Sequence, residues 1–457
     1  MSDGEKLEES EDAWREKGGA PSLHEVHRSV AVPSGLSFWR KLLAFSGPGF
    51  LVAVGYMDPG NWATDLAGGS RFGYTLLSVI FISNFMAILL QALSAKLGIV
   101  SGRDLAQGCR DHYSKPVNFV LWALCEIAIC ACDLAEVIGS AIALYLLFAI
   151  PLIWGVCLTA LDVLVVLYLQ NKGFRYIEAL VMALIFLIGG CFLAELIFCH
   201  PNMEAVFAGF VPRLAILQNK EMLYIAIGIL GATVMPHNLY LHSSIVQTRK
   251  YEQNASGKAE AIKFAMLDST IALMFALFIN AAILVVAGAV FFPAHQVVDD
   301  IRVAYTLFPK KLGLQISSVI FAVALLASGQ NATLTGTLAG QIVMEGFLNI
   351  RLRPWLRRLL TRGLAIIPAV VVVGLHTRGG VNQQFEAIGK LLILSQVILS
   401  LQLSFAVVPL VLFTSDRKKM GQFANSLWMN VLAWLTTAII IVLNLKYVLD
   451  FLGITGG

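Results

Sequence analysis

The sequence predicts an all-α integral membrane protein of about eleven transmembrane helices, with two of the helices broken near mid-membrane. Three observations predict this fold class. Hydrophobic residues make up 58% of the chain and charged residues only 14%, whereas a soluble domain carries about 25% charged residues. The apolar residues form runs long enough to span a bilayer, which takes about 20 residues. Two of these runs are interrupted by a proline, at Asp58-Pro59 and Met235-Pro236.

The apolar runs divide the chain into two halves of five helices and one additional helix. We expect a first repeat at about 43–198, a second, inverted repeat at about 222–414, and an extra helix at 424–455, which together form a transmembrane domain over 41–457. The individual runs are 43–71, 74–99, 116–148, 151–170, 176–198, 222–247, 262–292, 314–349, 355–376, 385–414 and 424–455.

The first 40 residues differ from the rest of the chain. They are polar, carry charges of both signs and lack the apolar stretch of a cleavable signal peptide. We expect residues 1–40 to form a disordered cytoplasmic tail. The net charge of +4 gives no indication of nucleic-acid binding, because in a membrane protein the positions of Lys and Arg matter more than their sum.

The distribution of basic residues predicts the orientation in the cell membrane. With the N-terminus in the cytoplasm, the basic groups Arg249-Lys250, Arg357-Arg358 and Arg417-Lys418-Lys419 fall on the same side as the tail. The opposite side then carries far fewer basic residues. Because cytoplasmic loops are enriched in Lys and Arg, we expect a cytoplasmic N-terminus and an extracellular C-terminus.

The two broken helices are the strongest functional signal. A proline inside a helix removes a hydrogen bond to the carbonyl four residues earlier, so Pro59 releases the carbonyl of Gly55 and Pro236 releases that of Ala232. Unwound backbone at this depth is tolerated only where it is buried in protein or lines a cavity. Broken helices at corresponding positions of two halves are typical of transporters built from inverted repeats.

The residues at the breaks offer ligands for a cation. Asp58 supplies a carboxylate, Asn61 an amide oxygen, Ala232 a carbonyl and Met235 a thioether sulfur. An ionised aspartate near the bilayer centre costs about 2.5–3.5 kcal/mol, so it needs a cationic partner. Oxygen ligands combined with one soft sulfur suit a divalent transition metal, whereas oxygen alone suits Mg²⁺ or Ca²⁺. The alternative is that Met235 fills a packing gap and Pro236 only kinks its helix.

Several motifs together resemble the Nramp family of proton-coupled divalent metal transporters, and within it the bacterial manganese importers. They agree with the family in order and spacing, and the resemblance extends from about residue 40 to the C-terminus. The motifs are Gly55–Asn61, Asp133–Glu136, Gly231–His237, Ala327–Gln341 and Ser395–Val397.

The resemblance implies the fold of the sodium-coupled amino-acid symporters and a site for the transported metal. Asp58, Asn61, the Ala232 carbonyl and Met235 would hold the metal, and Gln396 would join them in some conformations. It further implies import of Mn²⁺ and Fe²⁺, with Cd²⁺ and Co²⁺ tolerated, by proton symport and alternating access. We expect no resident cofactor and a monomer in the lipid bilayer.

Proton coupling requires titratable groups within the membrane. Asp133 and Glu136 lie three residues apart, on one face of a helix, and intramembrane acids are expensive and usually functional. The resemblance implies a proton route from Asp58 and His237 past Glu136 and Asp133 to Arg357 or Arg358. Alternatively, His237 is a satisfied core histidine and the two arginines are positive-inside anchors.

Two other functions compete with this interpretation. The first is a symporter of the same fold for amino acids or sodium, but Asp58 would repel an anionic substrate and Met235 disfavours Na⁺. The second is an intramembrane metalloenzyme. Such an enzyme needs a histidine-rich ligand set with an open coordination position, whereas the eight histidines here are scattered and form no HExxH motif.

Overall fold

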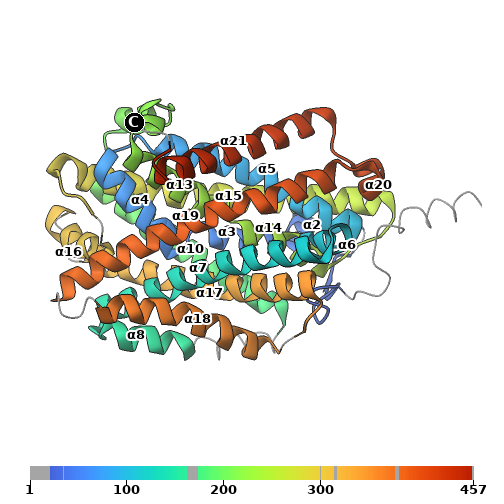
Figure 1. Cartoon of the computed structure of the whole chain (residues 1–457), viewed down its shortest axis with the longest axis horizontal. Coiled ribbons are helices and arrows are strands. Elements are labelled where there is room, and N and C mark those ends of the chain that lie inside the picture. The colour runs from blue at the N-terminus through green and yellow to red at the C-terminus, as the bar shows by residue number, and fades with distance from the viewer. Residues whose placement is uncertain are drawn as a thin grey trace, which may run out of the picture.

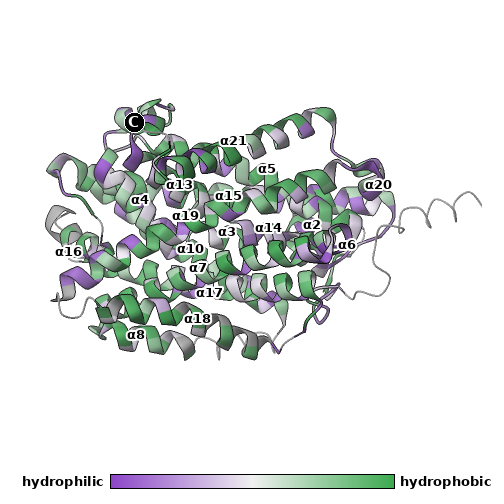
Figure 2. Ribbon diagram, viewed as in Figure 1, coloured by the Kyte–Doolittle hydropathy of each residue, from purple (hydrophilic) through white to green (hydrophobic). Residues whose placement is uncertain are grey.

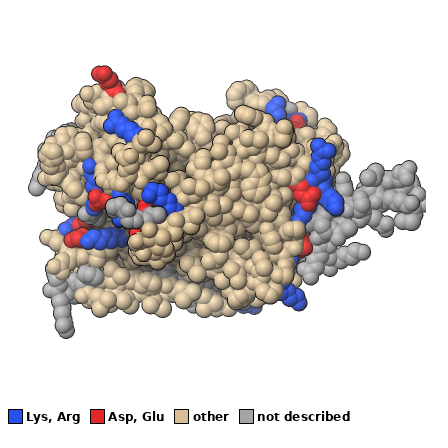
Figure 3. Space-filling view, turned by 45° about the horizontal axis from the view of Figure 1, so that its top comes forward, with Lys and Arg blue, Asp and Glu red and all other residues tan. Residues whose placement is uncertain are grey.

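The computed structural model describes residues 21–454 except 34, 36, 162–172, 299, 313–315, 352 and 376–379. The long helices run side by side along the longest axis of the molecule (Figure 1). Apolar residues cover their outer faces (Figure 2). In the face seen in Figure 3, charged side chains gather at the two ends and leave a broad uncharged band between them. This distribution matches a protein that spans a bilayer.

In the described part of the chain, seven continuous helices of 25 or more residues form most of the bundle, and two further helices are each broken into two parts. The broken helices are α3 (Pro48–Gly55) with α4 (Pro59–Phe72), and α13 (Lys220–Thr233) with α14 (Pro236–Ile245). The continuous ones are α5 (Leu77–Ser101), α7 (Lys115–Phe148), α10 (Phe174–Cys199), α15 (Ala255–Val290), α17 (Ile316–Leu348), α19 (Gly380–Ser415) and α21 (Leu427–Phe451).

Among the described residues, eight helices are long and apolar enough to cross a membrane, with α13 and α14 counted together. The other three expected spans do not meet this criterion of length and hydropathy. The first is split into pieces of 8 and 14 residues. The fourth is described only over α8 (Leu152–Leu158) and η1 (Thr159–Leu161), and the side chains of the ninth, α18 (Pro354–Leu375), are described only in part. A multi-pass α-helical membrane protein is confirmed, and the count of eleven stays a prediction.

Shorter elements connect the bundle helices at its two ends. They are α2 (Phe38–Phe45), α6 (Leu105–His112), α11 (Met203–Gly209), α12 (Ala215–Gln218), α16 (Ile301–Leu312), α20 (Arg417–Met420), η2 (Val246–Thr248), η3 (Phe292–Ala294), η5 (Gly421–Phe423), β1 (Val30–Ala31) and β2 (Arg249–Lys250). The first described residues lie at the end with α2, α6 and α20, and the C-terminus lies at the opposite end (Figure 1).

Residues 21–33 differ from the expected disordered tail, and we call them the N-terminal strap. Strand β1 pairs in parallel with β2, with Val30 opposite Arg249. The backbone N–H of Leu23, a buried residue, donates to Glu345 Oε2 of α17 at 3.0 Å. The prediction of disorder over 1–40 is therefore wrong for the strap, because its backbone and its apolar Leu23 find partners far along the chain. Residues 1–20 lie outside the described part.

Small residues bring the helices around the breaks into close contact. A Cβ on Gly139 of α7 would lie 2.2 Å from Pro59, and one on Gly329 of α17 would lie 2.3 Å from Ser140 Oγ. Helix packing in membranes depends on such small residues because they allow backbones to approach. As a result, α7 packs closely against the start of α4, and α17 packs closely against α7.

Candidate metal-binding site

The first break is a helix end followed directly by a capped helix start. Helix α3 ends at Gly55, and the chain turns before Asp58, which has extended backbone (φ −67°, ψ 164°). Asp58 Oδ1 accepts a hydrogen bond from the Asn61 N–H at 2.8 Å. An aspartate N-cap followed by proline at the first helical position is a favourable way to begin a helix. The residues Asp58–Asn61 therefore encode both the break and the new start.

The second break also consists of a helix end followed by a helix that begins at a proline, but no side chain caps the new helix. Helix α13 ends at Thr233 and α14 begins at Pro236. Val234 (φ −109°, ψ 66°) and Met235 (φ −64°, ψ 123°) both lie outside the α region, which for Met235 is expected of the residue before a proline. The unwinding of both helices, predicted from their prolines, is confirmed.

Three oxygens from the two breaks converge on the Asn61 side chain. Asn61 Nδ2 donates to Asp58 Oδ1 at 2.8 Å, to the Gly55 carbonyl at 3.2 Å and to the Ala232 carbonyl at 3.0 Å. These two carbonyls are the ones that Pro59 and Pro236 deprive of their helical partners. All of these residues are buried. The broken helices thus form one polar centre.

Met235 and Gln396 complete this centre. A Cβ on Gly55 would lie 2.9 Å from Met235 Sδ, so the sulfur lies against the residue that contributes a carbonyl. From α19, Gln396 Nε2 donates to Asp58 Oδ2 at 3.4 Å. Gln396 Oε1 is buried and has no hydrogen-bond partner among the described residues. All five residues predicted as ligands therefore lie together.

The centre gathers oxygen and sulfur donors of several kinds. No group of three or more His, Cys, Asp or Glu side chains in the described residues is arranged to hold a metal, whereas here one carboxylate is joined by carbonyls, amides and a thioether. The Asn61 amide nitrogen occupies the point where the oxygens meet. Rotating this amide would exchange its nitrogen for an oxygen of nearly the same size and present a further ligand to a cation.

The two acids of α7 lie together beside α17. Asp133 and Glu136 are both buried, and a Cβ on Gly336 would lie 2.8 Å from Glu136 Oε1 and 3.3 Å from Asp133 Oδ1. Thr333 Oγ1 donates to Glu136 Oε2 at 3.2 Å. The absence of a Cβ at Gly336 leaves the space that both carboxyl groups occupy.

The remaining residues of the predicted proton route are less completely described. His237 follows Pro236 in α14 and is buried, and its Nδ1 has no hydrogen-bond partner among the described residues. Arg357 and Arg358 belong to α18, but their side chains lie outside the part of the chain that the structure describes.

Cys132 and two polar residues of α17 join the site without having been singled out from the sequence. The Cys132 thiol lies 3.7 Å from Glu136 Oε1, and Cys132 packs in one buried cluster with Met235. Ser328 Oγ donates to the Met57 carbonyl at 2.5 Å, beside the first break, and Thr333 holds Glu136. The sequence feature that could have identified the α17 residues is the run of small and polar residues within Ala327–Gln341, since such residues are unusual inside an apolar helix.

Comparison with known proteins identifies the family. Residues 49–450 match the Nramp family, described as natural resistance-associated macrophage protein-like. The chain belongs to the Nramp family. An Nramp relative from Listeria welshimeri, named divalent metal cation transporter MntH, is 62% identical over 442 residues, which cover 96% of this chain and 97% of the relative. A relative of the same name from a Nostoc species is 63% identical over 425 residues, or 93% and 95% of the two chains.

Solved structures agree with the Nramp assignment. The manganese transporter of Eremococcus coleocola superimposes with a TM-score of 0.87 at 46% identity, covering 96% of this chain and 93% of that one. Mhp1, a nucleobase-cation symporter, shares the fold at 14% identity with a TM-score of 0.59. The relatives of this Nramp chain are transporters, and so the metalloenzyme interpretation is rejected.

Proposed function

We propose that this chain is a secondary active transporter that imports divalent transition metal ions, with Mn²⁺ as a main substrate. The observation that carries the proposal is the convergence of Asp58, Asn61 and the Ala232 carbonyl at the two helix breaks. The relatives named as divalent metal cation transporters and the similar manganese transporter support it. Met235 and Gln396 would complete the ligand set.

The proposed substrates follow from the mixture of ligands. Mn²⁺ and Fe²⁺ would bind, and Cd²⁺ and Co²⁺ would be tolerated, because each accepts oxygen ligands together with one sulfur. Mg²⁺ and Ca²⁺ prefer oxygen alone, so Met235 would act against them. The chain would bind these ions as cargo and would need no resident cofactor.

We further propose that metal import is coupled to protons. A cation close to a carboxyl group favours its ionised form, so metal arrival would release a proton from Asp58. His237 and then Glu136 and Asp133 would carry the proton inward, toward Arg357 or Arg358. The pairing of Asp133 with Glu136 beside Gly336 supports this route. Alternating access, a cytoplasmic N-terminus and action as a monomer complete the proposal.

Transport into liposomes tests these proposals. Purified protein is reconstituted into vesicles that enclose a metal-sensitive and a pH-sensitive dye. We expect saturable Mn²⁺ uptake that excess Cd²⁺ inhibits and that equal excesses of Ca²⁺ or Mg²⁺ leave unchanged, accompanied by acidification of the interior. Vesicles without protein serve as the control.

The two readouts separate the two proposals. Inhibition by Ca²⁺ as strong as that by Cd²⁺ would contradict selection by the sulfur. Mn²⁺ uptake with no change of internal pH would leave the metal transporter in place and overturn proton coupling. Absence of Mn²⁺ uptake would overturn the transport proposal itself.

A further inference from the structure

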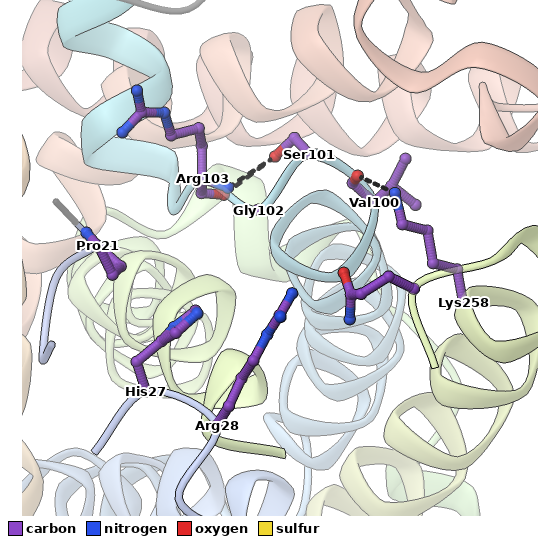
Figure 4. A pocket seen from close by; sticks show the side chains of 9 residues that line it. Pro21, His27, Arg28, Val100, Ser101, Gly102, Arg103 and Lys258 are labelled. Carbon is purple, nitrogen blue, oxygen red and sulfur yellow. Dashed lines mark hydrogen bonds between the residues drawn. The ribbon is translucent and has the colours of Figure 1, made fainter. Parts of the chain in front are cut away.

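The N-terminal strap forms one wall of a basic, solvent-open cavity at the end of the bundle, away from the candidate metal site. The cavity has a volume of about 330 Å³, which at roughly 30 Å³ per water molecule is room for about ten waters. Three segments far apart in the sequence surround it: the strap, the end of α5 with the turn after it, and the start of α15 (Figure 4). The polar residues that line it are His27, Arg28, Ser101, Arg103, Gln253 and Lys258.

The side chains around the cavity are cationic or neutral. Among the described residues that line it, none is acidic. His27 and Arg28 point into the cavity from the strap, whereas the Arg103 guanidinium points away and contributes its backbone (Figure 4). That guanidinium lies 3.2 Å from the carboxylate of Asp111. The positive charge that faces the cavity therefore comes mainly from Arg28 and Lys258, with His27 beside them.

The cavity is held open by fixed backbone. Helix α5 ends at Gly102, which has left-handed backbone (φ 63°), and no atom lies within 4 Å of the position of a Cβ there. Lys258 Nζ donates to the Val100 carbonyl at 3.1 Å, which fixes the ammonium at the cavity wall. The Arg28 N–H donates to the Gln247 carbonyl at 3.0 Å, which fixes the strap.

His27 adds a third nitrogen-bearing side chain to the cavity wall. Its Nδ1 is shielded from solvent and has no hydrogen-bond partner among the described residues, although a buried ring nitrogen normally has one. Burial and the neighbouring Arg28 charge lower the pKa of His27. An anion bound beside His27 and Arg28 would offset the effect of the Arg28 charge on His27.

We propose that this cavity binds a phosphate group, with Arg28, Lys258 and His27 as its ligands. A phosphate offers several strong acceptors to converging cationic donors, and arginine and lysine both suit it. Two sources share this chemistry. One is the headgroup of an anionic phospholipid, since basic clusters at the membrane surface recognise such headgroups. The other is a soluble phosphate compound.

Binding there would have a structural consequence. Arg28 belongs to the strap, whereas Lys258 belongs to α15, which also packs against α3 and α4. A phosphate bridging the two would fasten the strap to the end of the bundle. The site is thus a point where phosphate could stabilise the arrangement of the helix ends without touching Asp58 or Met235.

The test uses the full chain and two probes. In detergent, inorganic phosphate is titrated while the ¹³C-labelled ring of His27 is followed by NMR. In lipid nanodiscs, phosphatidylglycerol is compared with phosphatidylcholine by the same signal. We expect a saturable shift of the His27 resonance with one probe or both. Arg28→Gln combined with Lys258→Gln should weaken binding by about tenfold or more, the effect of losing charge-assisted hydrogen bonds.

Lys263→Gln is the matched control, because Lys263 is an exposed cation on the same helix as Lys258 and lies outside the cavity. It should leave the affinity within about twofold. A shift with phosphatidylglycerol alone assigns the site to lipid, and a shift with inorganic phosphate assigns it to a soluble compound. A His27 signal that neither probe moves, or an equal loss of affinity in Lys263→Gln, would overturn the proposal.

Discussion

At the scale of single residues, Asp58 combines a structural and a proposed ligand role. It caps α4 by accepting a hydrogen bond from the Asn61 N–H at 2.8 Å. The Asn61 side chain donates both to Asp58 and to the Ala232 carbonyl, and so links the two breaks. Capping alone would not require the charge, because asparagine caps helices about as well as aspartate. The charge is needed only if a cation binds, and this difference separates the two roles.

Asp58→Asn should therefore weaken Mn²⁺ binding by at least about a hundredfold, since loss of even an outer-shell partner costs about 10–100-fold. Calorimetric titration measures this. Asp104→Asn is the control, because Asp104 is also a buried N-cap, accepting from the Gln107 N–H at 2.8 Å. Equal affinities for Mn²⁺ in wild type and Asp58→Asn would show that Asp58 is only a cap.

Met235 is the residue on which metal selectivity depends in our proposal. Met235→Ala should lower the preference for Mn²⁺ and Cd²⁺ over Ca²⁺ by about tenfold, the equivalent of one interaction of about 1.4 kcal/mol. Competition between these ions in liposome uptake measures it. Met86→Ala removes another buried methionine, on α5, and should keep the preference. Unchanged discrimination in Met235→Ala would mean that its sulfur only fills space.

At the scale of elements, the contact of α7 with α17 determines where the intramembrane acids lie. Gly336 leaves room for Glu136 and Asp133, and Thr333 fixes one of the Glu136 oxygens. This arrangement can be disturbed without changing any titratable group, which makes it a direct test of the proposed proton route.

Gly336→Ala should push Glu136 away, because the new Cβ would lie 2.8 Å from Glu136 Oε1. We expect a loss of stability of about 1–3 kcal/mol from overpacking and less acidification for each Mn²⁺ transported, with Mn²⁺ binding retained. Gly190→Ala in α10 is the control, since no atom lies within 4 Å of its Cβ position. Normal acidification in Gly336→Ala would argue against the helix acids as the route.

At the scale of the whole molecule, a buried ionic network ties the start of α3 to α10 and β2. Arg249 and Glu178 are almost fully buried, with 2.6 Å between Arg249 Nη1 and Glu178 Oε1. Arg249 Nη2 donates to the Ser46 carbonyl at 2.6 Å, and Arg175 donates to the second Glu178 oxygen at 3.1 Å. These contacts fasten the helix ends beside the strap.

Arg249→Met should lower the free energy of unfolding by about 3–5 kcal/mol, because removing one partner leaves a buried charge incompletely paired. Unfolding in detergent measures the change. Lys390→Gln breaks an exposed pair with Glu386 on α19 and should have no measurable effect, as surface pairs contribute little. Equal stability of Arg249→Met and wild type would mean that Arg175 alone satisfies Glu178.

The sequence by itself determined the membrane-spanning helical class, the position of both breaks and the chemical types gathered at them. These follow from local physics, since a bilayer demands long apolar helices and a proline breaks the hydrogen bonding of its own helix. Hydropathy and proline position are therefore readable without knowing which helices are neighbours.

Tertiary structure alone decided which groups meet. Asn61 reaches the Ala232 carbonyl across 171 residues of sequence, and Arg249 reaches Glu178 across 71. The strap was expected to be disordered because its composition is polar, yet Leu23 finds Glu345 across 322 residues. Such pairs depend on the packing of distant helices, which leaves no periodic pattern in the chain, and for this reason the strap, its cavity and the ionic network are visible only in the folded molecule.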